Sequence, residues 1–277
     1  MHPLSPMTTH NAARVTIRTV PLGAPLHWLA LGWRDLVRGG WLSLLHGVAL
    51  TGFGLALLAV AHRQFWLLAG AFSGFLVVAP VLATSLYAIS RALAHRRPVS
   101  LALLRDTWLS WQQSRFSDSG GYWCMVRFGV LLALAGTGWV LTSAALITLM
   151  APAPVNAPID FLRHVVLARD NLLFETWLLL GGVLAAPIFA SSVVSMPLLL
   201  DRRVPLLQAV LTSWRVVLAN PAVMVLWASL ILVLVLLGFA TALLALVAVV
   251  PVLGHASWHA YDELVDASAL PLRPLDI

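Results

Sequence analysis

Three histidines lie within or beside long apolar stretches of the sequence: His46, His255 and His259. His255 and His259 are four residues apart, so in a helix they share one face. Imidazole rings bind metals and haem and can relay protons near neutral pH. Polar groups at membrane depth are costly and often functional. These residues are therefore the candidates for a metal, haem or proton-relay site, and the alternative is that their rings hydrogen-bond neighbouring helices.

A second set of polar side chains occurs where apolar stretches end. These tyrosine, arginine and aspartate residues could ring a vestibule at one face of a membrane: Tyr87, Arg91, Asp201, Arg202 and Tyr261. The alternative is that they are helix-end anchors, since tyrosine and arginine favour the membrane interface. Asp201 and Arg202 are adjacent, so we expect them to form a local ion pair.

Motifs of soluble catalysis are missing from the sequence. It contains no GxSxG, HExxH, Walker A or paired-cysteine motif. The single cysteine, Cys124, excludes an internal disulfide. No apolar stretch carries an acidic residue near its middle, which argues against a coupled transporter built on a midplane carboxylate. We therefore expect no enzymatic activity and no cofactor.

The composition is that of an integral membrane protein. Of the 277 residues, 60% are hydrophobic and 10% are charged, which leaves too little polar surface to cover a soluble globule. All 17 basic residues are arginines, and they flank the apolar stretches instead of forming a basic domain. This distribution predicts contact with the lipid bilayer and none with nucleic acid.

The apolar stretches predict an all-α protein with six transmembrane helices, because about 20 apolar residues cross the hydrocarbon layer. The expected spans are about 41–61, 65–90, 122–150, 172–200, 221–238 and 241–262. The stretch from Pro221 to Tyr261 has no polar break and is about twice the length of one span. We expect it to fold back between Gly238 and Thr241, and the alternative is one tilted span that continues along the interface.

Short amphipathic helices are expected before each pair of spans, at about 26–38, 100–116 and 205–218. In the first of them, Leu26, Leu29, Trp33, Leu36 and Val37 share the apolar face, opposite Arg34, Asp35 and Arg38. A proline followed by small residues and then by tyrosine or charge recurs after Pro80, Pro187 and Pro251, which indicates an internal repeat of three hairpins. The remaining segments are a flexible tail over 1–24, one membrane domain over 25–266 and a C-terminal tail over 267–277.

The arginines predict the orientation. With six spans, fourteen arginines fall on the side of the two termini and three on the other: Arg63, Arg163 and Arg169. Positive charge concentrates on the cytoplasmic side of membrane proteins. We therefore expect a multi-pass protein of the bacterial inner membrane with both termini in the cytoplasm.

Five segments resemble an uncharacterised family of bacterial integral membrane proteins, classed as a domain of unknown function. They read GWRDL from Gly32, YAISR from Tyr87, PLLLDR from Pro197, NPAVMVLWA from Asn220 and GHASWHAYDEL from Gly254. The resemblance covers nearly the whole chain after the N-terminal tail, and the last segment is its most specific part. Some relatives are labelled as cytochrome c oxidase subunit I, but that enzyme needs about six intramembrane histidines. This chain has three, so we reject that function.

Two main hypotheses of function remain, with a third behind them. The first is a non-enzymatic accessory or assembly protein that packs against itself or another membrane complex. The second is a permease for a small solute or a lipid-like molecule, with a vestibule at the cytoplasmic pole. The third is a haem or metal protein that uses His46, His255 and His259.

Overall fold

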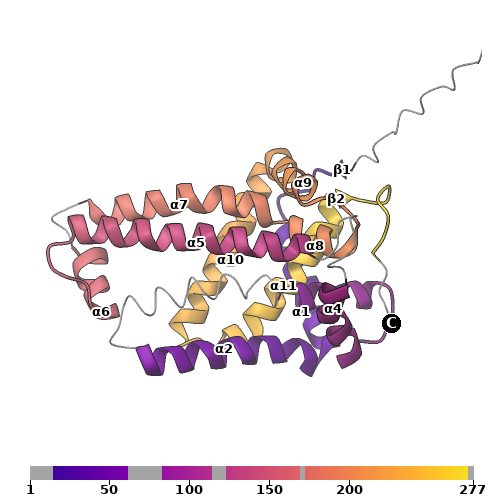
Figure 1. Cartoon of the computed structure of the whole chain (residues 1–277), viewed down its shortest axis with the longest axis horizontal. Helices are drawn as coiled ribbons and strands as arrows, with labels where there is room; N and C mark the ends of the chain where they lie inside the picture. Colours follow the sequence, from indigo (N-terminus) through magenta and orange to yellow (C-terminus); the bar gives the residue numbers. More distant parts are fainter. Residues whose placement is uncertain (1–14, 62–82, 114–122, 169–171, 274–277) are drawn as a thin grey trace, which may run out of the picture.

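The computed structural model describes residues 15–61, 83–113, 123–168 and 172–273. Most of these residues are helical; the long helices labelled α2, α5 and α7 lie along the long axis of the molecule, and α10 crosses it at a steep angle (Figure 1). Four described helices are long and apolar enough to cross a membrane: Trp41–Val60, Cys124–Met150, Leu173–Asp201 and Pro221–Ala240. Their outward side chains include Leu134, Leu179 and Val233, which are at least 60% exposed. Exposed leucine and valine on this scale are typical of helices that face lipid.

The first half of the chain contains α1 (Ala24–Gly39), α2 (Trp41–Ala61), an unlabelled helix over 83–94, α4 (Leu101–Gln113) and α5 (Trp123–Met150). Gly40, with φ of 58°, joins α1 to α2 in a conformation that favours glycine. The predicted spans at 41–61 and 122–150 correspond to α2 and α5. Most of the predicted span at 65–90 lies outside the described residues.

The second half begins with α6 (Pro158–Phe161) and the π-helical turn η2 (Leu162–Val166). The expected span at 172–200 forms two helices, α7 (Leu173–Ser192) and α8 (Ser195–Asp201). The remaining helices are α9 (Leu206–Ala219), α10 (Pro221–Ala240) and α11 (Leu246–Leu264). The fold-back after Pro221 is therefore present in the structure. It starts slightly later than expected, at Thr241, and Ala242 and Leu243 take positive φ values in the turn.

Helix α11 is the central element of the core. It packs along α1 and α2, and it also contacts α8 and α10. Two glycines allow the close approach. A Cβ atom on Gly32 of α1 would lie 2.6 Å from the carbonyl oxygen of Val252, and a Cβ atom on Gly47 of α2 would overlap the main chain of Val247. The turn between α10 and α11 lies beside the middle of α2, where the Thr51 hydroxyl donates to the Leu243 carbonyl at 3.3 Å.

Both ends of the described chain contact other parts of the fold. Strand β1 (Thr16–Ile17) pairs in antiparallel fashion with β2 (Val265–Asp266). The expected N-terminal tail over 1–24 thus includes a paired strand, and the expected C-terminal tail includes Arg273, which is 5% exposed. Asn220 directly precedes the first residue of α10. Its side chain does not cap α10 but accepts from the Val20 amide and donates to the Arg18 carbonyl.

Figure 1 shows how these elements are distributed along the molecule. The helices α1, α4 and α9 gather with the β1–β2 pair toward one end, and α6 lies at the other. Helices α5 and α7 lie side by side between the two ends, and they are in contact. Because β1 pairs with β2, the two ends of the described chain lie at the same end of the fold.

Candidate functional site

Four of the five polar residues predicted to ring a vestibule meet in one network. The carboxylate of Asp201, at the end of α8, forms ion pairs with the guanidinium groups of Arg91 at 2.8 Å and Arg202 at 2.7 Å. The Tyr261 hydroxyl of α11 donates to the same carboxylate at 2.9 Å. The Arg91 and Asp201 side chains are 3% and 7% exposed. This group, which we call the Asp201 network, therefore joins three helices through a buried ion pair.

The C-terminal segment completes the Asp201 network. The Arg91 guanidinium donates to the Arg273 carbonyl at 2.7 Å, and the Arg273 amide donates to the Asp201 carbonyl at 2.9 Å. Arg202 donates to the Leu270 carbonyl at 2.9 Å. Main-chain carbonyls thus accept hydrogen bonds from guanidinium N–H groups that do not bind a carboxylate. The segment from Leu270 to Arg273 is consequently bound across the ends of α8 and the 83–94 helix.

Tyr87, the fifth predicted residue, lies outside this network. It lies one helical turn before Arg91 and, with Ser257 of α11, lines a cavity. Its ring is 9% exposed and belongs to the hydrophobic core. The structure therefore places Tyr87 below the Asp201 network and beside a cavity.

The three candidate histidines hydrogen-bond neighbouring groups of the protein. His255 Nδ1 lies 2.8 Å from Ser90 Oγ, and its Nε2 lies 3.0 Å from Ser43 Oγ. Ser90 donates to Asp35 at 2.9 Å, and His259 lies 2.7 Å from the same carboxylate oxygen. Because Ser90 gives its proton to Asp35, it accepts from His255 Nδ1, and in the neutral imidazole Nε2 then accepts from Ser43. The result is a directional chain of hydrogen bonds that ends on Asp35.

His46 lies apart from this chain, with Nδ1 donating to the Leu42 carbonyl at 2.9 Å. Within the described ranges, no three histidine, cysteine, aspartate or glutamate side chains form a group that could hold a metal ion. The predicted trio of His46, His255 and His259 is therefore not assembled as a ligand set. The rings instead make the hydrogen bonds to protein groups that the alternative interpretation describes.

Asp35 is the residue of this site that the sequence pattern misplaced. It was expected on the polar face of the first amphipathic helix with Arg34 and Arg38, but it is 2% exposed and points toward α11. Ser43 and Ser90, both fully buried, were not singled out either. A signal was present, since a buried histidine needs polar partners. The candidates for these hydrogen-bond partners were the serines at similar depth in the neighbouring apolar stretches.

The Asp35 carboxylate makes the stability dependent on pH. Burial raises its pKa, but the hydrogen bond and charge of His259 and the Ser90 hydroxyl outweigh this, and the net pKa lies below the ordinary value. A carboxylate with a lowered folded-state pKa stabilises the fold above its unfolded pKa, and this stabilisation is lost as the pH falls through the folded value. We expect the melting temperature to drop on acidification below about pH 4. Thermal melts of the wild type and Asp35→Asn across pH 3–7 test this, because the variant should lack that component, and an identical acid limb in both proteins would contradict it.

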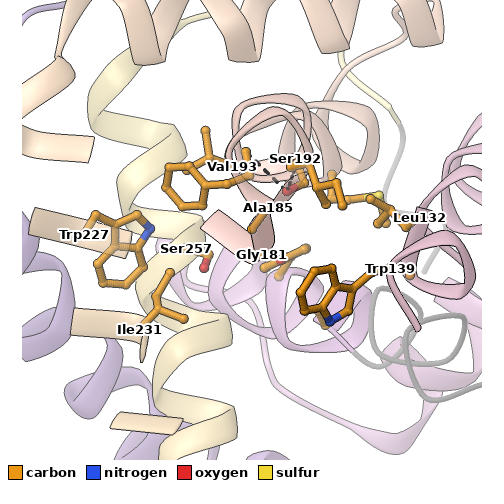
Figure 2. A pocket seen from close by; sticks show the side chains of 15 residues that line it. Leu132, Trp139, Gly181, Ala185, Ser192, Val193, Trp227, Ile231 and Ser257 are labelled. Carbon is orange, nitrogen blue, oxygen red and sulfur yellow. Dashed lines mark hydrogen bonds between the residues drawn. The ribbon is translucent and has the colours of Figure 1, made fainter. Parts of the chain in front are cut away.

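A cavity of about 530 Å³ lies between α5, α7, α10, α11 and the 83–94 helix. Figure 2 shows Trp139 and Leu132 on one side of this chamber and Trp227 and Ile231 on the other, with Ala185 and Ser257 between them. Most of its described lining is apolar, and the hydroxyls come from Tyr87, Ser192 and Ser257. The volume is within the range of sites for small molecules, which are mostly apolar with a few placed polar groups.

The chamber and the Asp201 network share the 83–94 helix and α11. Tyr87 and Ser257 line the chamber, and Arg91 and Tyr261 follow each of them by four residues. Side chains four apart on a helix lie on one face, one turn from each other. The Asp201 network is therefore positioned next to the chamber, toward the end where β1 and β2 pair.

The comparisons with known proteins agree with a membrane protein. No curated protein and no solved structure matches the chain. A family profile matches residues 67–201, which contain Arg91, Asp201, α5 and α7. The segments at Gly32, Asn220 and Gly254, on which part of the resemblance rested, lie outside the matched range. The resemblance to a family of unknown function is nevertheless confirmed: residues 67–201 match the family described as Predicted integral membrane protein (DUF2189).

Proposed function

We propose that this protein is a non-enzymatic membrane protein that holds an apolar, lipid-like molecule in the chamber between its helices. The observation that carries the proposal is the cavity of about 530 Å³, lined mainly by aliphatic and aromatic side chains. Burial of apolar surface supplies about 25 cal/mol per Å². The proposal develops the second of the two main functions expected from the sequence, that of a permease for lipid-like molecules.

The surroundings of the chamber favour a ligand that comes from the bilayer. On one side are α5 and α7, whose outward faces carry exposed leucines such as Leu134 and Leu179. On the side of the chain ends, the Asp201 network ties together α8, α11 and the 83–94 helix. An apolar molecule would therefore enter between helices from the hydrocarbon layer, and the network would keep water out from the other direction.

A single substitution can place a large side chain inside the chamber. Ala185 of α7 points into it (Figure 2), and Ala186 is adjacent but is not part of the described lining. We expect Ala185→Phe to abolish binding of a co-purifying lipid, whereas Ala186→Phe should retain it. Native mass spectrometry of the proteins purified from membranes measures the bound mass. Equal ligand occupancy in the wild type and Ala185→Phe would refute the chamber as the binding site.

In this proposal both termini face the cytoplasm of a bacterial inner membrane. The pairing of β1 with β2 supports termini on one side, and fourteen of the 17 arginines fall on that side if six helices enter the membrane. Three times a shorter helix precedes a long one, as α1–α2, α4–α5 and α9–α10, which supports the expected repeat. A reporter protein that is active only in the cytoplasm should be active when it is fused after Ile277. Activity only in the periplasm would contradict this orientation.

The third hairpin, formed by α10 and α11, begins and ends beside the β1–β2 pair. Asn220 contacts the residues after β1, and α11 leads directly into β2. Its turn lies beside Thr51, ten residues from each end of α2. If α2 crosses the membrane, this hairpin reaches about half the depth of α2. The hairpin would then be part of the membrane domain, and Thr51 would satisfy the main-chain carbonyl of Leu243 in its turn.

A role in a membrane complex remains part of the proposal. The exposed apolar faces of α5 and α7 would serve either lipid or a partner helix, and an accessory protein would use them for packing. Co-purification from native membranes with identification of bound proteins tests this role. An isolated monomer in mild detergent with no bound protein would remove it and leave the lipid-binding proposal intact.

A further inference from the structure

Helices α1 and α9 carry the same pattern of exposed side chains. Apolar residues recur at spacings of four, three and four, which places them on one face of a helix. The set in α1, here the α1 stripe, is Leu26, Ala30, Trp33 and Val37, and the set in α9, the α9 stripe, is Leu207, Leu211, Trp214 and Leu218. An exposed arginine follows the tryptophan of each stripe, Arg34 in α1 and Arg215 in α9.

Both stripes face away from the core. The buried faces of the two helices include Trp28 of α1 and Val216 of α9, each 0% exposed. At 3.6 residues per turn, each stripe lies about 150–180° around its helix from the buried face. Val37 is 66% exposed and Leu218 is 73% exposed. An apolar face on this side of a helix indicates contact with lipid or with a partner.

The neighbouring long helices favour lipid. A single residue, Gly40, joins α1 to α2, and Asn220 alone joins α9 to α10. Both α2 and α10 are long and apolar enough to cross a membrane. Trp33 and Trp214 lie about two turns before them, and α1 and α9 gather at the same end of the molecule (Figure 1). The stripes are therefore placed where two long helices would enter one membrane surface, the level at which tryptophan and arginine are enriched.

The arginines beside the stripes favour a lipid that carries negative charge. Arg34 is 49% exposed, and the carboxylate of Asp35 lies 3.9 Å from it. Arg215 forms no ion pair with a carboxylate in the described ranges. It lines a hollow of about 260 Å³ beside the α9 stripe, together with Leu207, Leu211 and Gln208. A guanidinium group binds phosphate through paired N–H donors, and the Gln208 amide is a further donor.

We infer that α1 and α9 lie in the headgroup layer of one leaflet and bind acidic phospholipids there through Arg34 and Arg215. The phosphate group binds Arg215 in the hollow, and the adjoining part of the lipid contacts Leu207 and Leu211. The α1 stripe makes the equivalent contact without a hollow. This inference goes beyond the proposed function and is independent of a ligand in the chamber.

The first test compares dioleoyl phosphatidylglycerol with dioleoyl phosphatidylcholine by native mass spectrometry of the detergent-purified full chain. We expect phosphatidylglycerol to bind more tightly, because it carries a net negative charge. The double variant Arg34→Gln with Arg215→Gln should lower the ratio of the two affinities about fivefold, the effect of one arginine near an anionic surface. Arg163→Gln is the matched control, because Arg163 is also exposed but lies in η2, which packs on α6 at the other end. An unchanged ratio in the double variant, or an equal loss in the control, would overturn the inference.

The second test measures the depth of the stripes in vesicles of the same two lipids. Cys124, the single cysteine of the chain, is first replaced by serine. Spin labels are then attached in Val37→Cys, Leu218→Cys and, as the exposed control, Ser268→Cys. Labels on both stripes should meet oxygen, which dissolves in lipid, more often than a water-soluble nickel chelate, and the control should show the reverse. Greater access to nickel at the stripes, or protection from both reagents as beneath a partner protein, would contradict a lipid contact.

Discussion

Replacing Asp201 with alanine should destabilise the protein by about 3–5 kcal/mol, the usual cost of leaving a buried charge without its partner. Arg91 is 3% exposed and forms its ion pair with Asp201. The same carboxylate accepts hydrogen bonds from Tyr261 and Arg202. Removing it leaves a buried guanidinium and a buried phenol with reduced hydrogen bonding. Thermal unfolding of the purified protein in one detergent, followed by circular dichroism, measures the loss.

Two further variants separate this effect from a general loss of charge. Asp106→Ala removes an exposed partner of Arg105 and should cost less than about 1 kcal/mol. The double variant Arg91→Met with Asp201→Leu replaces the pair with apolar groups, and such replacements are often close to neutral. We therefore expect it to be more stable than Asp201→Ala alone. A double variant as unstable as the single one would show that the pair is not the source of the effect.

Gly47→Ala should also be strongly destabilising, by at least about 2 kcal/mol. Its Cβ atom would overlap the carbonyl oxygen of Val247 and lie 2.6 Å from the carbonyl carbon. These are main-chain atoms of α11, so no side chain can rotate away. The two helices would have to separate along their whole contact. Thermal unfolding and the retention volume on size-exclusion chromatography should both report the change.

Gly52→Ala is the control on the same helix. A Cβ atom at Gly52 meets nothing within 4 Å. Alanine has a higher helix propensity than glycine, so this variant should be as stable as the wild type or more stable by up to about 1 kcal/mol. If both substitutions had the same effect, the close approach of α2 and α11 would not be what holds them together.

The long apolar helices could be predicted from the sequence because hydrocarbon thickness dictates their length. The spans expected at 41–61 and 122–150 match α2 and α5, and the uninterrupted stretch after Pro221 does fold back. The pairing of the two ends of the chain could not be predicted. Residues 16–17 and 265–266 carry no strong strand signal, and they pair because the fold brings them together across the whole chain length.

The candidate site was predicted in part. Arg91, Asp201, Arg202 and Tyr261 were grouped because each ends an apolar stretch, and the structure joins them. Asp35 was assigned to a solvated face because its neighbours Arg34 and Arg38 are charged. The periodicity of a helix is the same whether one acidic residue faces water or a histidine on another helix. Only the packing of α1 against α11 distinguishes the two.

The chamber had no sequence signal. Its walls come from segments far apart in the sequence, from Ala83 to Ser257, and most of its described residues are aliphatic or aromatic, which is common in any membrane helix. Small residues such as Gly181 and Ala185 create space only where a facing helix does not fill it. That condition depends on the crossing of α10 and α11 past α5 and α7.

Photo-crosslinking with a lipid analogue that carries a diazirine on its acyl chain tests the central claim most directly. In membranes containing the full-length protein, we predict crosslinks at chamber residues such as Leu132, Trp139 and Ile231, and their loss in Ala185→Phe but not in Ala186→Phe. Crosslinks confined to outward residues such as Leu134 and Leu179, and unchanged by Ala185→Phe, would contradict a lipid-binding chamber.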